Sequence, residues 1–180
     1  ALTDGGAYFA RMITASDGKT IAYSTELIEA FVEQVIARQP DALLLSGDLT
    51  FNGARQSHVD LAAQLQRITD AGIPVFVLPG NHDLNSTMAA RFEGDGYTRV
   101  ESVTAAQFMA LYATLGFSSA RSRDPASCSY IADITPSLRV LMVDVNTADA
   151  PGELTAQTRD WVETQRQEAQ ADGGCVLAVR

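Results

Sequence analysis

Two short apolar runs, each followed at once by a glycine-led polar cluster, constrain the fold of this chain more than any other feature. The runs are residues 42–45 and 74–78, and the clusters that follow them are residues 47–53 and 80–83. Short apolar runs that end at glycine predict buried β-strands. Residues 57–71 between them have helical spacing, and a strand–helix–strand crossover makes the two strands parallel. Both clusters should therefore lie at the same sheet edge, where open α/β sheets bind ligands.

These clusters contain the side chains that we predict to carry chemistry. Asp48 follows the first strand, and Asn81, His82 and Asp83 follow the second. Carboxylate and amide oxygens can ligate a hard cation, and a neutral imidazole can ligate a metal or transfer a proton. A Gly-Asp dipeptide alone is most often an ordinary turn, and a lone histidine is most often structural. It is the convergence of the two clusters that predicts a metal site.

Composition limits the classes of protein that this chain can represent. Its 180 residues, 46% of them hydrophobic, can bury one sizeable core, which favours a single domain. The formal net charge of -9 argues against a nucleic-acid partner, because binding to the phosphate backbone depends on clustered Lys and Arg. A phosphorylated substrate would therefore need bound cations. No apolar run approaches the roughly 18 residues of a membrane span, and the compartment stays open between cytoplasmic and exported bacterial.

The remaining pattern predicts helices and strands on both sides of this unit. Helices are expected over residues 24–39, 104–115 and 154–171, a hairpin over residues 128–134 and 138–145, and a last strand over residues 175–179. Residues 1–23 give no clear assignment beyond a turn at Asp17-Gly18. We expect a strand that ends a chain to be followed by more sequence.

Several single residues favour structural roles over functional ones. Ser57 with Asp60, and Thr104 with Gln107, have the spacing of helix capping boxes. His58 is expected to pack or cap rather than to join the site.

Four further features complete the sequence-based expectations. Asp144 closes an apolar run and favours a structural turn or a supporting role near the site. Cys128 and Cys175 are expected to be small buried hydrophobic residues. The long polar stretch of residues 85–102 could roof a cleft beside His82.

Gly47-Asp48 and Gly80-Asn81-His82-Asp83, at the ends of neighbouring strands, strongly resemble blocks of the calcineurin-like metallophosphoesterase family. Gly152, Leu154 and Trp161 are similar to a later surface helix of that family. A bacterial subgroup whose members are often exported is similar over a wider set of residues: 47–53, Ser57-His58, 92–94 and 127–130.

The resemblance implies a layered α/β sandwich, of three or four layers, with a mixed β-sheet. It implies hydrolysis of a phosphomonoester or phosphodiester by a dinuclear centre with a bridging hydroxide. Asp48 would bridge two divalent transition-metal ions (Mn, Fe, Zn or Co), and Asn81 would bind the second. His82 would contact the phosphoryl group and protonate or stabilise the leaving oxygen, and Asp83 would orient His82. Asp at position 83 slightly favours small-molecule or diester substrates.

The chain departs from the family at its histidines. The family's Asp-x-His and Gly-His-x-His blocks are absent, and His58 and His82 are the two histidines of the sequence. We therefore expect residues 1–180 to form a single metallophosphoesterase-like domain that lacks the first strand and the C-terminal metal-ligand blocks, and that is inactive or weakly active by itself.

Two rival interpretations follow. The first is a catalytically degenerate module that binds a phosphorylated ligand or a protein partner. The second is an unrelated doubly wound nucleotide binder. It would need a glycine-rich phosphate loop, and none follows either strand.

Overall fold

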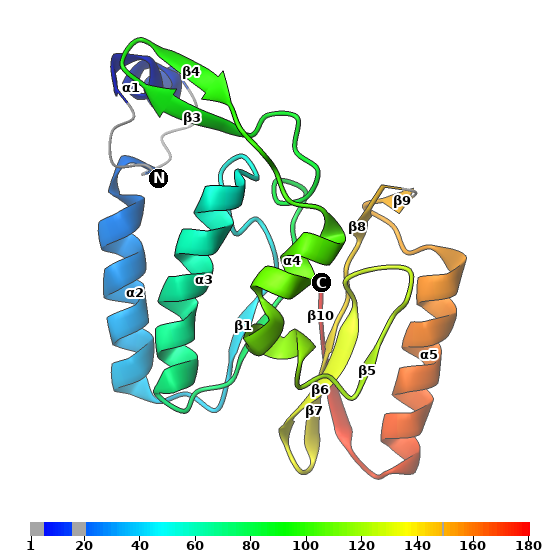
Figure 1. Ribbon diagram of the computed structural model, residues 1–180. Helices are drawn as coiled ribbons and strands as arrows, with labels where there is room; N and C mark the ends of the chain where they lie inside the picture. The colour runs from blue at the N-terminus through cyan, green and yellow to red at the C-terminus, as the bar shows by residue number, and fades with distance from the viewer. Residues whose placement is uncertain (1–5, 16–20, 149) are drawn as a thin grey trace.

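The computed structural model describes residues 6–15, 21–148 and 150–180 (Figure 1). The turn expected at Asp17-Gly18 lies outside these residues. The helices are α1 (Gly6–Ala15), α2 (Ser24–Arg38), α3 (Arg55–Asp70), α4 (Ala105–Leu111) and α5 (Ala156–Ala171), with short helical turns η1 (Ile21–Tyr23) and η2 (Ala113–Phe117). The strands are β1 (Leu43–Leu45), β2 (Val75–Val77), β3 (Ala90–Glu93), β4 (Gly96–Arg99), β5 (Ser122–Arg123), β6 (Tyr130–Thr135), β7 (Leu138–Met142), β8 (Asn146–Thr147), β9 (Ala150–Pro151) and β10 (Cys175–Val179).

The predicted strand–helix–strand unit is confirmed. β1 and β2 are parallel neighbours, with Leu43 opposite Val75 and Leu45 opposite Val77, and α3 is the crossover between them. Both strands therefore end at the same edge. The predicted hairpin is confirmed as well, because β6 and β7 pair antiparallel. β10 adds parallel to β7, which makes a mixed sheet in the order β10-β7-β6-β5.

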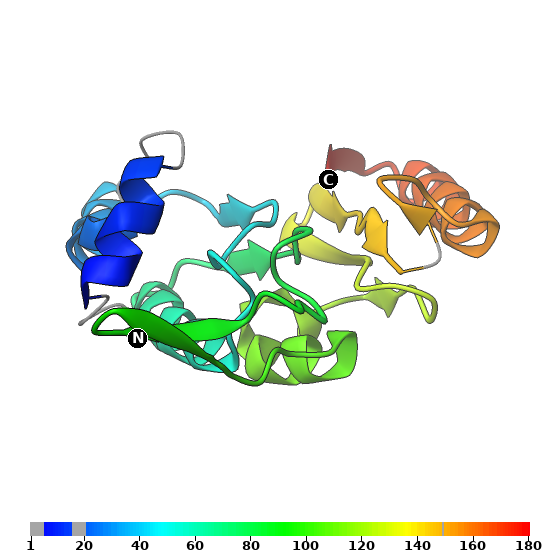
Figure 2. The same cartoon turned by 90° about the horizontal axis from the view of Figure 1, so that it is seen from above.

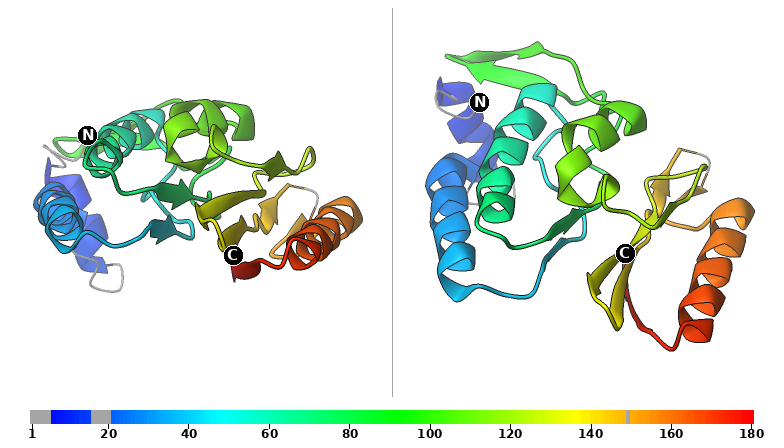
Figure 3. Two further views of the ribbon diagram at one scale, coloured as in Figure 1. Left: turned by 90° about the horizontal axis from the view of Figure 1, so that it is seen from below. Right: turned by 60° about the horizontal axis from the view of Figure 1, so that its bottom comes forward.

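The elements stack as an α/β sandwich of four layers, as the sequence resemblance implied. α2 and α3 lie on one outer side, the β1–β2 pair and the four-stranded sheet lie inside, and α5 lies on the other outer side (Figures 1 and 3). One core cluster joins α2, α3, β2, α4 and the inner faces of β6 and β7. A smaller cluster joins the outer face of the four-stranded sheet to Trp161 and Val162 of α5.

A buried hydroxyl links the two sheets. Tyr130 in β6 donates a hydrogen bond from its hydroxyl to the carbonyl oxygen of Val77 in β2, at 3.0 Å. Gly116 makes room for this ring, because a Cβ at Gly116, whose φ is +114°, would collide with the hydroxyl group of Tyr130. This buried hydrogen bond therefore ties the four-stranded sheet to the end of β2.

The two predicted helix caps have different outcomes. Thr104 and Gln107 form the expected capping box at the start of α4. The box expected at Ser57 and Asp60 is wrong, because α3 begins at Arg55 with Ala54 as its N-cap. Arg55 donates its backbone N–H to the carbonyl of Glu101 at 2.9 Å, and this tertiary contact starts the helix two residues early.

The polar stretch of residues 85–102 contains the β3–β4 hairpin, which packs against α1 (Figures 1 and 2). Tyr8 and Phe9 of α1 contact Phe92 of β3, with ring centroids 6.3 and 5.1 Å apart. This α1–hairpin cap is the largest feature that the sequence pattern left unassigned.

The cysteines behave differently from each other. Cys128 is buried as expected, whereas the expectation for Cys175 is wrong because it is exposed at the start of the edge strand β10; both are free thiols. Among the helices of the described residues, none is both long and apolar enough to cross a membrane.

Candidate active site at the ends of β1 and β2

The backbones that follow β1 and β2 touch each other, and this contact explains the glycine at the head of each cluster. Gly47 has a φ of +107°, and a Cβ there would lie 2.8 Å from the Cα of Gly80. A Cβ at Gly80 would collide with the backbone nitrogen and the Oδ1 atom of Asp48. Only glycine at both positions lets the two loops approach so closely.

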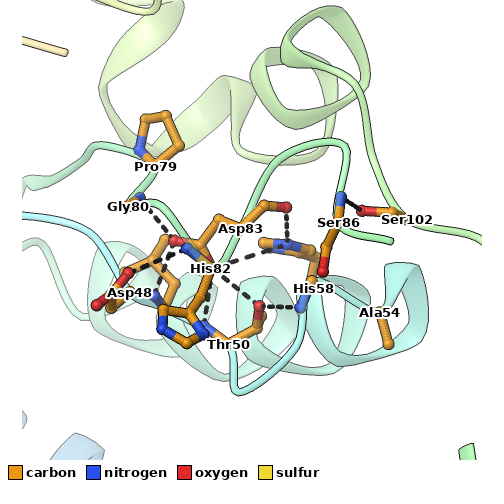
Figure 4. A network of polar contacts seen from close by, with 12 residues as sticks. Asp48, Thr50, Ala54, His58, Pro79, Gly80, His82, Asp83, Ser86 and Ser102 are labelled. Carbon is orange, nitrogen blue, oxygen red and sulfur yellow. Dashed lines mark hydrogen bonds and ion pairs between the residues drawn. The ribbon is translucent and has the colours of Figure 1, made fainter. Parts of the chain in front are cut away.

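Asp83 is the buried anchor that holds these two loops together. Its side chain is fully buried and accepts hydrogen bonds from the backbone N–H groups of Leu49 at 2.9 Å, Thr50 at 2.9 Å and Gly80 at 2.7 Å. The hydroxyl of Thr50 donates a fourth bond at 2.8 Å (Figure 4). One carboxylate therefore cross-links the loop after β1 to the turn after β2.

Asp48 stands at the exposed rim of the same contact. It adopts a left-handed conformation with a φ of +50°, which aspartate tolerates better than most residues do. Its Oδ1 atom accepts the backbone N–H of His82 at 3.2 Å. The predicted pairing of Asp48 with the turn after β2 is therefore present in the structure.

His82 is exposed, and its ring is held by a backbone carbonyl. Nδ1 lies 3.0 Å from the carbonyl oxygen of Phe51. Because a carbonyl only accepts hydrogen bonds, Nδ1 carries a proton in this arrangement. The expectation that Asp83 orients the ring of His82 is corrected here. The carboxylate of Asp83 accepts hydrogen bonds from backbone amides, and Nδ1 of His82 donates to the carbonyl oxygen of Phe51 instead.

Asn81 is exposed and lies between Gly80 and His82 in the turn after β2. Both of these neighbours contact Asp48. The structure thus brings Asp48, Asn81 and His82 together at the edge of the sheet and separates Asp83 from them as an internal support.

His58 lies behind the site and not in it, as expected. It is fully buried, with Nε2 3.1 Å from the carbonyl of Asp83 and Nδ1 3.0 Å from the hydroxyl of Tyr112. Burial lowers the pKa of His58 below its ordinary value of 6.5, although the nearby carboxylate of Asp83 acts in the opposite direction. Burial also raises the pKa of Tyr112. The neutral ring donates from Nε2 and accepts from Tyr112.

Asp144 has the structural role that the sequence favoured. It is buried and accepts the backbone N–H groups of Cys128 at 3.0 Å and Asn146 at 2.8 Å. Sequence analysis missed Asn146, whose side-chain amide donates to the carbonyl of Pro79 at 3.2 Å. Its place a few residues beyond an apolar strand, like that of Asp48 after β1, was the available signal.

An open groove of about 1160 Å³ begins at Asp48 and His82. Its lining includes residues 48–52 and 54 of the loop after β1 and residues from the N-terminal parts of α2 and α3. Residues of β3, among them Phe92, line it as well. The stretch of residues 85–102 therefore does border a cleft beside His82.

The side chains at the site are of the chemical type that binds a divalent cation, but they are too few to complete its ligand shell. A carboxylate and an amide that are exposed next to an imidazole are suitable donors for a transition metal. Within the parts of the chain that the structure describes, no three or more His, Cys, Asp or Glu side chains gather closely enough to hold a metal ion. Asp48 and Asn81 would thus be only part of a ligand shell.

Comparison with known proteins gives two matches. The family model described as calcineurin-like phosphoesterase matches residues 22–147, more than two thirds of the chain. A probable cyclic nucleotide phosphodiesterase of Pseudoalteromonas sp. (strain SM9913) is 45% identical over 49 residues, which are 27% of this chain and 18% of that protein. The chain therefore aligns with less than a fifth of the length of this relative. Both glycine-led clusters lie inside the family match.

Proposed function

The chain belongs to the calcineurin-like phosphoesterase family, and from that premise we propose that it carries part of the active site of a metal-dependent phosphodiesterase. Asp48 and Asn81 are the proposed metal ligands, and His82 is the proposed catalytic residue. The observation that carries this proposal is the contact of Asp48 with the backbone of His82 at the ends of two parallel strands.

The contact with Phe51 supports a proton-transfer role for His82. Since the carbonyl of Phe51 accepts a hydrogen bond from Nδ1, Nε2 is the ring nitrogen that remains for a ligand. In the proposed reaction, Nε2 donates to a phosphoryl oxygen or to the leaving oxygen. Asp83 supports this arrangement indirectly because it fixes the loop that precedes Phe51.

Two divalent ions, when bound, would supply the positive charge that a phosphoryl group needs and would acidify an attacking water. Asp48 and Asn81 are the residues of this chain that would hold them. The rest of the chain is acidic, with a net charge of -9, so it offers little positive charge of its own. The same charge supports the expectation that nucleic acid is not the substrate.

A phosphodiester is the substrate class that we favour. The relative from Pseudoalteromonas is named a probable cyclic nucleotide phosphodiesterase, and the open groove of about 1160 Å³ that Asp48 and His82 line is large enough for a substituent beyond the phosphate. We therefore propose a small diester, such as a cyclic nucleotide, over a phosphomonoester.

Titration of the chain with Mn²⁺, followed by NMR, tests the metal site. We expect paramagnetic broadening of the backbone amide signals of Asp48, Asn81 and His82. The Asp48→Asn variant should lose this broadening, because it removes the charge while keeping the shape of the loop. Asp70→Asn, at the opposite end of α3, is the matched control and should behave like the unchanged chain.

Hydrolysis of bis(4-nitrophenyl) phosphate by the full-length protein with excess Mn²⁺ tests the reaction, because Asp48 and Asn81 are only part of a ligand shell. His82→Gln should lower the rate by about 100-fold, the lower end of the usual contribution of acid–base catalysis, while the Mn²⁺ broadening persists. Broadening without any hydrolysis would favour the alternative of a non-catalytic module that binds phosphorylated ligands. If Mn²⁺ affects signals elsewhere but not those of Asp48 and Asn81, the proposed site is wrong.

A further inference from the structure

The groove beside His82 has an aromatic end. Phe51 and Phe92 both line it, and both are half-buried, so that part of each ring faces open space. Their ring centroids lie 6.5 Å apart at an interplanar angle of 53°. Behind them, Phe9 packs edge-on against Phe51 and tilted against Phe92, at 6.5 and 5.1 Å.

Phe51 connects this aromatic end directly to the site. Its backbone carbonyl holds Nδ1 of His82, and its side chain lines the groove. Phe51 therefore belongs both to the support of His82 and to the lining of the groove.

The aromatic wall is anchored rather than free to swing. Asn52 donates from Nδ2 to the carbonyl of Ala90 at 3.1 Å, which ties the Phe51 loop to the start of β3. On the return side of the hairpin, Arg55 donates its backbone N–H to the carbonyl of Glu101. The backbone segments that carry the two rings are therefore tied to neighbouring segments.

The charges along the groove argue against a second phosphate there. Among the described residues that line it, Arg55 and Arg91 carry guanidinium groups, and Asp48, Asp60, Glu93 and Glu101 carry the more numerous carboxylates. Arg91 is also 3.7 Å from Glu93. An uncharged planar group, which can stack on phenyl rings whatever its hydrogen-bonding pattern, suits this end better.

We propose that Phe51 and Phe92 form a binding subsite for the planar aromatic substituent of the substrate, a nucleobase being the class that fits best. This proposal rests on the proposed function, since it assigns the substituent that the diester would place in the groove. Phe51 thus has two roles: its carbonyl positions His82, and its ring determines which esters bind well.

Binding of adenosine, which carries no phosphate and needs no metal, tests the subsite by NMR titration of the chain. We expect chemical-shift changes at Phe51 and Phe92 and no comparable effect of ribose. Phe92→Leu and Phe51→Leu keep the apolar bulk but remove the aromatic faces, and each should weaken binding at least about 10-fold, within the range that alanine substitution gives for base stacking.

Tyr97→Leu is the matched control because Tyr97 belongs to the same aromatic cluster through Tyr8 and Phe92 but does not line the groove. This variant should bind adenosine like the unchanged chain. Equal binding of ribose, equal loss in all three leucine variants, or no adenosine binding would overturn the subsite. Adenosine binding is measured without metal, so failure of the metal site and failure of the subsite give different results.

Discussion

The two regions that hold a buried aspartate just beyond a strand end use the same device for different purposes. After β2, Asp83 accepts three hydrogen bonds from Leu49 and Thr50, in the loop that carries Asp48 and Phe51, and a fourth from Gly80 in its own turn. Beyond β7, Asp144 accepts two backbone bonds, from Cys128 and Asn146. Both carboxylates satisfy backbone N–H groups that strand pairing leaves without partners.

The difference lies in what surrounds each aspartate. Beside Asp83, two adjacent polar side chains, Asp48 and His82, remain exposed and face a groove. Around Asp144, the neighbouring polar group of Ser129 is buried and bonded to the backbone of Asp144 itself. The region around Asp83 therefore presents reactive groups to solvent, whereas the region around Asp144 is a closed joint between β6 and β7.

Replacing Asp83 gives the largest expected effect on this comparison. Asp83→Ala leaves three backbone N–H groups and a hydroxyl without their buried acceptor, and we expect the free energy of unfolding to fall by about 3–5 kcal/mol. Urea denaturation followed by circular dichroism measures the change. A loss below about 1 kcal/mol would mean that Asp83 does not hold the two loops together.

Replacing Asp144 should have a smaller effect because it holds fewer donors. We expect Asp144→Ala to lower the free energy of unfolding by about 2–3 kcal/mol in the same measurement. It should also expose Cys128, whose pKa is raised by burial and by the nearby Asp144. In the unchanged folded chain, a thiol reagent should label Cys175 and spare Cys128; equal labelling of both would show that this joint is not closed.

The buried histidine behind Asp83 makes stability depend on pH. Because the folded pKa of His58 is lowered from 6.5, the unfolded chain binds more protons than the folded chain below that pH. The contribution of His58 to the free energy of unfolding is therefore greatest above about pH 6.5. It falls as the pH drops toward the folded pKa of His58, by at most about 1.4 kcal/mol per pH unit.

The His58→Gln variant should flatten this dependence, as measured by thermal unfolding between pH 7.5 and pH 5, the window set by the lowered pKa. His82→Gln, which removes the other histidine of the sequence, is the matched comparison. If His82→Gln flattens the curve and His58→Gln does not, the assignment to the buried ring is wrong.

Asp48 should contribute the smallest effect on stability, although it lies beside Asp83. Asp48→Asn keeps the left-handed turn and the bond from His82, so the free energy of unfolding should change by no more than about 0.5 kcal/mol. If Asp48→Asn lowered the free energy of unfolding as much as Asp83→Ala, the two aspartates would form one structural unit. Asp83 could then no longer be described as the buried support and Asp48 as an exposed residue at its rim.

Sequence reasoning found the parts of the fold that depend on local pattern. Apolar runs that end at glycine predicted β1 and β2, two β-rich runs joined by a short turn predicted the β6–β7 hairpin, and Thr104 with Gln107 predicted the start of α4. It misplaced the start of α3, where a tertiary bond from Arg55 to Glu101 decides the boundary. The α1–hairpin cap was missed because its aromatic residues contact partners far away in the chain.

The same division holds for the candidate site. The position of Asp48, Asn81 and His82 at one sheet edge followed from the sequence, because parallel pairing brings strand ends together whatever the details of the fold. The hydrogen-bond partners of these side chains could not be predicted from the sequence. Asp83 binds backbone amides, and His82 is held by a carbonyl, since backbone geometry after the strands sets which donor each acceptor meets.

By itself, the sequence determined a layered α/β protein with two polar clusters at one sheet edge. Glycine and apolar spacing are local properties, and they are enough to specify strands, turns and their direction. Only the tertiary structure decided that Asp83 is a buried anchor, that Phe51 serves His82, and that an aromatic groove adjoins them. Each of these depends on contacts between segments some thirty to eighty residues apart, which form only when the whole core has packed.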